Sequence, residues 1–267
     1  MTLVDAGLRV ALGLAIGSFG TLIGAGGGFL LVPLLVLGYH FSPATAVGTS
    51  LSLVFLNAAS GSAAYLRQRR VDLALAWKLA AATVPGAIGG AYLNRLLSSV
   101  TFHLLFGVVL VALAAFLLSG ISVAPSQRAN RRRLLDAGGE AHAYHVDEWK
   151  GVVVSFVVGF LSSVLGIGGG IIHVPFLIVA LSLPVHVATA TSHFVLSISA
   201  FVGALTYLLL GDVNLETTAL MGAGILVGAQ LGARASLRAG ATLIRRILAG
   251  SLALVGLRMM LQGLGRA

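Results

Sequence analysis

Two glycine-rich stretches, GAGGGFLLVP at 24–33 and GIGGGIIHVP at 166–175, hold the residues of this sequence best suited to bind a solute. Glycine frees the backbone and proline cannot donate an amide proton, so each stretch predicts a break in a helix. Amides freed at such a break, at the positive end of the helix that follows, attract anions. Close helix packing is the structural alternative. The predicted backbone donors are Gly26, Gly27, Gly28, Gly168, Gly169 and Gly170.

A stripe of polar and small residues follows each glycine stretch at spacings of three or four. It runs from Ser50 to Tyr65 in the first copy and from Ser192 to Tyr207 in the second. This spacing places each stripe on one face of a helix, where hydroxyl and amide donors can complete the coordination of an anion without a full charge in lipid. The alternative is that the hydroxyls bond to carbonyls of their own helix. The predicted side-chain ligands are Thr49, Ser50, Asn57, Thr191 and Ser192.

Two histidines distinguish the second copy of this pattern from the first. His173 and His193 lie in apolar segments, where the first copy has Leu31 and Leu51. An ionisable side chain at such depth is a functional candidate, and histidine exchanges a proton near neutral pH. Both are therefore candidates for proton coupling. Each is equally compatible with a neutral, hydrogen-bonded histidine between helices.

The acidic residues point away from cation transport. All eight carboxylates fall in or beside loops, whereas cation-coupled pumps keep carboxylates in their interior. The sequence contains no cysteine, which excludes thiolate metal sites. His142 and His145 form an H-x-x-H pair, but no third histidine lies near it, so a solvated loop is the favoured reading. We expect a small anion as partner, and no metal or cofactor.

The composition of the sequence indicates that these residues lie in a membrane. The chain is 58% hydrophobic and 9% charged, with a mean hydropathy of +1.01, as expected for an integral membrane protein in the lipid bilayer. The net charge of +9 resides in loops, where it sets membrane orientation, so we expect no nucleic-acid partner. Apolar stretches of helical length predict an all-α, multi-pass protein of the cytoplasmic membrane. They fall at 4–24, 45–66, 72–94, 100–120, 151–166, 185–210, 216–233 and 242–262.

The chain contains an internal duplication. A shift of 142 residues places the first glycine stretch on the second, and it also superimposes the Thr-Ser pairs and the pairs of tyrosine and leucine that end the polar stripes. Such a repeat is typical of transporters. We predict a first transmembrane repeat at 1–119, a polar basic linker at 120–149 and a second repeat at 150–267.

Two topologies fit this duplication. If 4–38 crosses the membrane once, each half has four crossings and the repeats are parallel. If it folds back at the glycines, each half has a broken hairpin and three transmembrane helices, and the repeats are inverted. Only the second arrangement collects every cluster of basic loop residues on one side. It predicts a cytoplasmic central linker and both termini outside. The length of 4–24 favours the first arrangement.

The duplicated G-x-G-G-G-x-x-x-V-P motif, the Thr-Ser pairs and the basic central loop resemble the sulfite exporter TauE/SafE family, also called the toluene sulfonate uptake permease family. The resemblance covers nearly the whole chain and places the motifs of the family on 24–33 and 166–175. It implies transport of sulfur-containing anions such as sulfite, sulfoacetate or other sulfonates across the cytoplasmic membrane.

Three functions remain open from the sequence. The first is a secondary transporter for a small sulfur-containing anion, with a central site at the glycine breaks and protons as a candidate coupling ion. The second is a passive anion channel that uses the same breaks. The third is an intramembrane enzyme with Ser192 and His193 as nucleophile and base. Adjacent helical residues point about 100° apart, which disfavours the enzyme.

Overall fold

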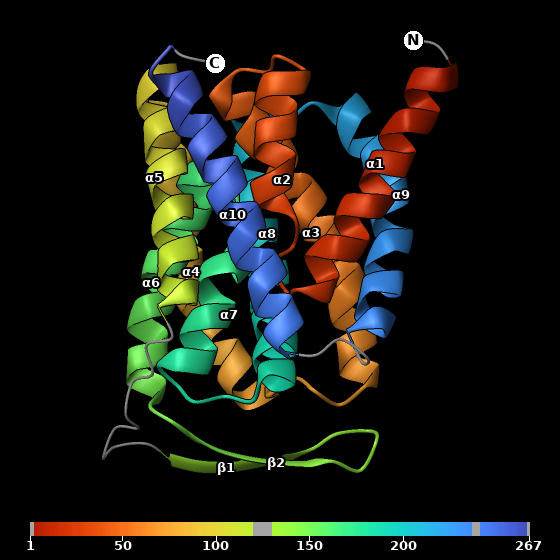
Figure 1. Ribbon diagram of the computed structural model, residues 1–267, viewed down its shortest axis with the longest axis vertical. Coiled ribbons are helices and arrows are strands. Elements are labelled where there is room, and N and C mark those ends of the chain that lie inside the picture. Colours follow the sequence, from red (N-terminus) through yellow and green to blue (C-terminus); the bar gives the residue numbers. More distant parts are fainter. Residues whose placement is uncertain (1–2, 120–129, 237–240, 266–267) are drawn as a thin grey trace.

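The computed structural model describes residues 3–119, 130–236 and 241–265, so residues 120–129 of the expected linker lie outside the described residues. Within these ranges the chain forms a helical bundle with a two-stranded hairpin at one end (Figure 1). The bundle agrees with the all-α membrane architecture predicted from the sequence. The helices before the hairpin are α1 (Leu3–Leu22), α2 (Gly28–Pro33), the π-helical turn η1 (Leu34–Gly38), α3 (Pro43–Arg67), α4 (Leu73–Asn94) and α5 (Ser99–Leu118). Those after it are α6 (Glu148–Leu165), α7 (Gly170–Val179), α8 (Val185–Leu209), α9 (Leu215–Ala235) and α10 (Ala241–Gly263).

Polar side chains fix where several helices begin. An N-terminal helix turn leaves backbone N–H groups without partners, and a preceding serine, aspartate or asparagine accepts one of them. Each capping side chain accepts the N–H three residues further along. The caps are Ser42 for α3, Asp72 for α4, Ser98 for α5, Asp147 for α6 and Asn214 for α9.

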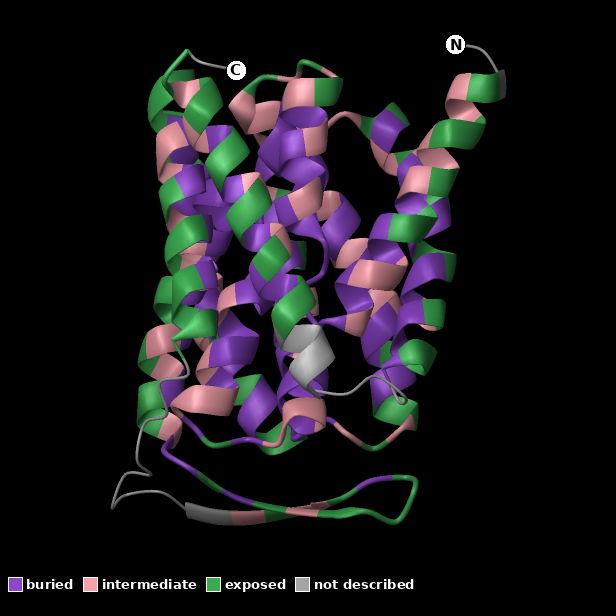
Figure 2. Ribbon diagram, viewed as in Figure 1, coloured by how far each residue is buried: buried purple, intermediate pink, exposed green. Residues whose placement is uncertain are grey.

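Length and composition make several helices suitable for spanning a membrane. Among the described residues, α3, α4, α5, α6 and α8 are long and apolar enough to cross a bilayer, and 28–38 and 170–179 are shorter apolar helices. Buried residues gather along the middle of the bundle, while exposed residues lie on its outside (Figure 2). Large apolar side chains such as Trp77, Val157 and Leu209 are exposed there, which suits a surface covered by lipid.

The two chain ends lie at one end of the bundle and the hairpin at the other (Figure 1). From the end that holds the N-terminus, α1 runs to about the middle of the bundle, and α2 returns toward the same end. On the opposite side of the middle, α7 lies in the half of the bundle nearer to the hairpin. The glycine stretches that connect α1 to α2 and α6 to α7 therefore lie near mid-depth.

The most extensive helix packing joins elements from opposite sides of the hairpin in the sequence. The pairs are α1 with α9, α4 with α6, α5 with α10, and α3 with α8. Glycines allow two of these pairs to approach closely. A Cβ on Gly224, Gly228 or Gly232 would lie 2.0, 2.3 or 2.1 Å from a carbonyl oxygen of α1. Gly86 and Gly90 of α4 meet carbonyls of α6 in the same way, so glycines four residues apart let these helices pack closely.

The hairpin is the element that the sequence did not reveal. We expected 120–149 to be a polar loop, but Asn130–Leu135 (β1) pairs antiparallel with Ala141–Val146 (β2). The tight turn between them contains Gly139, whose φ of +86° lies in the left-handed region. Its strands are short and rich in arginine and histidine, so they lack the apolar alternation that marks a strand in a sequence.

Candidate functional site

The first glycine stretch interrupts the helix as predicted. Gly24, Gly26 and Gly27 have φ values of +72°, +74° and +81°, a backbone conformation that side chains disfavour. The amides of Ala25 and Gly26 turn back to the carbonyl oxygen of Gly20, at 2.9 and 3.1 Å. The Gly26 amide therefore has a partner, contrary to the prediction that it is free.

The second stretch repeats this geometry. Gly166 ends α6 with a φ of +68°, Gly168 has the same φ, and α7 begins at Gly170. Among the described atoms, no hydrogen-bond acceptor meets the amides of Gly27, Gly28, Gly168, Gly169 and Gly170. Both stretches therefore keep unpaired donors inside an apolar bundle.

The prolines of the motifs do not end their helices. Pro175 lies within α7, and the chain continues from Pro33 at the end of α2 directly into the π-helical turn η1. The interruption thus comes from the glycines, with each proline a short distance downstream. Because a proline ring cannot donate to the preceding turn, it loosens the helix without stopping it here.

The two breaks lie against each other. A Cβ on Gly28 would lie 2.5 Å from the carbonyl oxygen of Gly166, and one on Gly170 would lie 2.3 Å from that of Gly24. These two contacts are equivalent under the 142-residue shift. The breaks therefore meet backbone to backbone, and they leave no room between them for a side chain.

Thr49 and Thr191 have structural partners. The Thr49 hydroxyl accepts the N–H of Asn214 at 2.9 Å, and the Thr191 hydroxyl accepts the N–H of Asp72 at 3.1 Å. Each threonine thus holds the residue that caps a helix of the other half. Their proposed role as ligands now has a structural alternative that the sequence could not show.

Ser50 and Asn57 also bond within the protein. The Ser50 hydroxyl donates to the carbonyl of Gly166 at 2.8 Å, across to the second break. The Asn57 amide donates to the carbonyl of Gly17 at 3.1 Å, and its oxygen accepts from the Thr21 hydroxyl. Both side chains are fully buried. The sequence reading missed Thr21, because it lies on the first helix and not in the polar stripe.

Ser192 and His193 differ from these residues because part of their hydrogen-bonding capacity is unused. The Ser192 hydroxyl and His193 Nδ1 are buried and have no hydrogen-bond partner among the described residues. Nε2 of His193 lies 3.4 Å from the Thr21 hydroxyl, and the ring packs edge-on against Tyr65. Thr189, one turn earlier on α8, has a buried hydroxyl in the same condition. The sequence analysis missed Thr189, although its spacing of three and four from Ser192 and His193 places it on the same helical face.

His173 is a satisfied histidine. Its Nε2 lies 2.8 Å from the Ser155 hydroxyl, which itself donates to the carbonyl of Gly151 at 2.7 Å. The hydroxyl proton is thus committed, so His173 donates to the serine oxygen. Of the two histidines that the sequence singled out, only His193 lies beside the end of α1 that leads into the first break, where its Nε2 is 3.4 Å from the Thr21 hydroxyl.

The H-x-x-H pair does not form a metal site by itself. His142 and His145 lie three residues apart on β2, so they point to opposite faces of the hairpin. Asp136, Glu140 and His142 do gather their ligand atoms within 4.8 Å. However, Arg70 already pairs with the Asp136 carboxylate at 3.4 Å, which opposes a cation there.

Ion pairs hold the hairpin on the bundle. Arg132 of β1 donates to both oxygens of Asp72, at 2.7 and 2.9 Å, and Tyr144 of β2 donates to the same carboxylate at 2.9 Å. Arg132 also pairs with Glu148 at the start of α6. Asp72 therefore caps α4, anchors the hairpin and, through its N–H, contacts Thr191 of α8.

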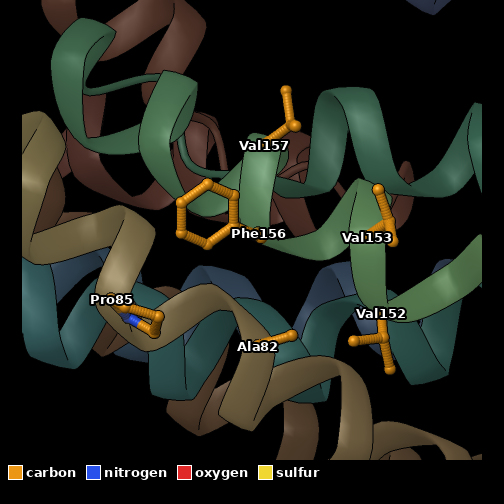
Figure 3. Close-up of a pocket in the computed structure, with 6 residues that line it drawn as sticks. All are labelled: Ala82, Pro85, Val152, Val153, Phe156 and Val157. Atoms are coloured by element: carbon orange, nitrogen blue, oxygen red, sulfur yellow. The ribbon is translucent and has the colours of Figure 1, made fainter. Parts of the chain in front are cut away.

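Two open hollows among the described residues lie away from the glycines of the breaks. One, of about 320 Å³, lies between α4 and α6 and is lined by Ala82, Pro85, Val152, Val153, Phe156 and Val157 (Figure 3). Its apolar lining suits a lipid chain and offers nothing to an anion. Another, of about 300 Å³, lies beside η1 and includes Arg258 of α10.

An apolar helical bundle with two interrupted helices meeting at its centre defines a multi-pass α-helical membrane protein. Residues 9–259 match the family model described as Sulfite exporter TauE/SafE. The chain belongs to the sulfite exporter TauE/SafE family, a family of membrane transporters.

Relatives agree with this assignment. The chain is 31% identical to the probable membrane transporter protein YunE of Bacillus subtilis, over 96% of this chain and 98% of the relative. It is 26% identical to a probable membrane transporter protein of Methanocaldococcus jannaschii, over 95% of each chain. A stretch of 64 residues, 24% of this chain and 15% of the relative, is 44% identical to Sulfite exporter TauE/SafE family protein 6 of Arabidopsis thaliana. No solved structure matches the chain.

Proposed function

We propose that this protein is a secondary transporter that moves a small sulfur-containing anion, such as sulfite or a sulfonate, across the cytoplasmic membrane. The observation that carries the proposal is the pair of helix breaks that meet in the apolar core with unpaired amides, at Gly27, Gly28 and 168–170. An unpaired amide in a membrane interior costs several kcal/mol unless something accepts its proton. An anion satisfies these donors. The name of the family supports sulfur chemistry in the substrate.

The architecture that we propose is a pair of inverted repeats at 1–119 and 150–267. Reciprocal contacts support it: Gly28 meets Gly166 as Gly170 meets Gly24, and Thr49 holds Asn214 as Thr191 holds Asp72. The position of both termini opposite the hairpin also fits it. Basic residues of the linker then lie in the cytoplasm and both termini lie outside. A reporter fused after Ala267 should therefore be active only outside the cell, and a cytoplasmic reporter would refute the inversion.

Contact between the breaks favours a transporter over a channel. Because the Gly28 and Gly170 backbones touch the opposite break, an anion reaches the amides only after the two halves separate. Such a movement is the step that distinguishes alternating access from a permanently open path. Protons are the coupling ion that we propose, since buried histidines and not carboxylates adjoin the breaks.

Flux into proteoliposomes tests the function directly. Sulfite, thiosulfate, sulfate and methanesulfonate would be offered to the purified protein, and we expect saturable uptake of at least one. Gly169→Leu should abolish this uptake, because its side chain would fill the second break against Val158. Gly250→Leu is the matched control, since a side chain at 250 on α10 meets nothing within 4 Å. Undiminished uptake by a folded Gly169→Leu protein would remove the breaks from the site.

A further inference from the structure

We infer that Thr189, Ser192 and His193 form the side-chain half of the anion site, and that His193 takes up a proton on Nδ1 when the anion binds. The inference rests on the proposed function and assigns a location and a coupling step to it. The three residues lie at positions i, i+3 and i+4 of α8, so they share one face of that helix.

The first support is unused hydrogen-bonding capacity. Thr189 is 3% exposed and Ser192 and His193 are 0% exposed, yet the two hydroxyls and Nδ1 have no partner among the described residues. Buried polar groups are almost always paired, because an unpaired one costs about 1–3 kcal/mol. Three such groups on one helical face indicate that a ligand completes them.

The second support is their position beside the first break. A Cβ on Gly24 would lie 2.5 Å from the Thr189 methyl group, so this residue touches the glycine stretch directly. The unpaired amides of Gly27 and Gly28 follow within the same stretch. Backbone and side-chain donors thus converge on one locality.

The corresponding face of α3 lacks these features. The 142-residue shift places Val47, Ser50 and Leu51 against the second break, and Val47 indeed contacts Gly166 there. Two of these side chains are apolar, and Ser50 spends its hydroxyl on the Gly166 carbonyl. The α3 face is therefore closed where the α8 face keeps unused donors, and the unpartnered hydroxyl beside the second break belongs to Ser162 of α6 instead.

The protonation state of His193 follows from a chain of hydrogen bonds. A carbonyl can only accept, so Asn57 turns its NH₂ to Gly17 and its oxygen to Thr21. Thr21 must then donate its hydroxyl proton to Asn57, which leaves its oxygen to accept from His193 Nε2. Neutral His193 carries its proton on Nε2, and Nδ1 is a bare acceptor that repels an anion.

Anion binding at Nδ1 therefore requires a second proton on the ring. The proton comes from the acid form of the buffer in the aqueous solution, which is left as its conjugate base, and bonds to the Nδ1 lone pair; the ring becomes an imidazolium with an N–H directed at the ligand. A monovalent anion that enters with this proton forms a neutral pair. Movement of that pair across the membrane is electroneutral.

Other ionisable groups leave His193 as the proton acceptor. Tyr65 of α3 packs edge-on against its ring, with centroids 5.7 Å apart, and donates its hydroxyl to the Thr21 carbonyl. Residues 10–22 of α1 and all of α2 contain no ionisable side chain, and α3 adds only Arg67. The other ionisable side chains on elements packed against α8 are Lys78 and Tyr92 of α4, Glu148 and Lys150 of α6, and His173 of α7. Among the described residues, the contacts of the His193 ring are with Thr21 and Tyr65 and not with these side chains.

Calorimetry on the purified full chain tests the inference. Methanesulfonate, thiosulfate and sulfate stay ionised at neutral pH, so titration in buffers of different ionisation enthalpy counts the protons bound by the protein alone. We expect uptake of about one proton per anion by the wild type, from the single Nδ1 site. His193→Gln should bind the anion with no proton uptake and no dependence on pH.

Two hydroxyl variants separate ligation from proton uptake. Thr189→Val and Ser192→Ala should each weaken binding about 5- to 30-fold, as expected for one lost hydrogen bond to an anion, and leave the proton count unchanged. Matched controls on the same helix are Thr206→Val and Ser197→Ala, whose hydroxyls donate to carbonyls of α8 itself. The controls should bind as the wild type does.

The outcomes distinguish this inference from the proposed function. If none of the three anions binds to the folded wild type, and sulfite shows no uptake in vesicles, the transport function falls and the inference with it. Anion binding without proton uptake, or with equal uptake by His193→Gln, overturns the inference alone. Unchanged affinity in both Thr189→Val and Ser192→Ala would also overturn it.

Discussion

At the scale of residues, a few buried polar atoms decide what this bundle can do. Asn57 joins Gly17 and Thr21 of α1 to α3, and Thr21 in turn meets His193 of α8. These bonds connect three helices through side chains that water does not reach. These hydrogen bonds fix which atom donates at each step from Gly17 to His193, so His193 has a defined tautomer beside the first break.

Replacing Asn57 by alanine should destabilise the protein. The change removes the side-chain donor to the buried Gly17 carbonyl and the acceptor of the buried Thr21 hydroxyl proton, which costs about 1–3 kcal/mol. We expect a lower midpoint of thermal unfolding in detergent, followed by size-exclusion chromatography after heating. Ser251→Ala on α10 is the control, because its exposed hydroxyl bonds only to its own helix. An unchanged midpoint for Asn57→Ala would show that the bonds contribute nothing.

Residue types and spacing are enough to single out part of the site that we propose. Glycine runs, Ser192 and His193 stand out in the sequence because they are rare choices for an apolar helix. The roles of Thr49 and Thr191 cannot be seen in the sequence, since each bonds to a residue of the other half more than 100 positions away. Thr189 was missed for a related reason. Only the structure shows that its hydroxyl, unlike that of Ser197, has no helix carbonyl as partner.

At the scale of elements, the hairpin is tied to the bundle by charge. The Asp72 carboxylate accepts hydrogen bonds from Arg132 and Tyr144 of the hairpin while it caps α4, so one carboxylate joins both strands to a membrane helix. Burial, the neighbouring carboxylate and the hydrogen bond to it raise the pKa of Tyr144, which therefore stays a donor. The hairpin thus covers the end of the bundle from which α4 and α8 start.

Arg132→Ala should loosen the hairpin. The substitution leaves the buried Asp72 carboxylate without its cation and removes the link to Glu148 as well. We expect faster hydrogen–deuterium exchange across 130–146, with an opening free energy lower by about 1–3 kcal/mol. Arg133→Ala is the matched control, since this neighbouring side chain is exposed. Equal exchange in both variants would contradict the anchoring role of Asp72.

Acid should also release the turn of the hairpin. Burial raises the pKa of Asp136, but the N–H groups of Glu140 and Gly138 and the Arg70 guanidinium outweigh burial and hold it below the ordinary 3.8. A lowered pKa stabilises the folded turn above the ordinary value, and this stability is lost as pH falls through the lowered one. Exchange at 136–140, corrected for intrinsic rates, should therefore rise only below about pH 4. Asp136→Asn should remove this acid step, and its persistence there would assign the step elsewhere.

The sequence predicted the helices better than the hairpin. Each apolar stretch became a helix whose ends lie within a few residues of the expected ones, because length and hydropathy suffice to specify a helix in lipid. The strands at 130–146 depend on ion pairs with Asp72 and Arg70, which come from a distant part of the chain. No local pattern carries that information.

At the scale of the whole molecule, the two halves of the sequence do not fold beside each other as separate bodies. α1 packs on α9, α4 on α6, α5 on α10 and α3 on α8, so the extensive interfaces all join one half to the other. The glycine breaks follow the same rule. Any movement that opens the centre must therefore slide or tilt helices across these shared interfaces.

The halves should consequently assemble from separate chains. When residues 1–125 and 126–267 are co-expressed, with a tag on one of them, we expect the partner to copurify, because the cross-half helix interfaces bury the apolar faces of both. Either half expressed alone should aggregate or be degraded. A control pair cut at 111–112, within α5, should copurify poorly, since the cut divides a helix. Stable, monodisperse single halves would contradict the interlocked packing.

The backbone contact at the centre also constrains how the gene can diverge. Gly28 and Gly170 each contact the break of the other copy of the repeat. A substitution in one copy therefore disturbs the packing of the other. A methyl group at 28 or 170 acts as a wedge between the copies, and no compensating change within the same copy makes room for it. The polar residues of α8 are not under this constraint and can be substituted during evolution, whereas the contacting glycines of both copies must be retained together.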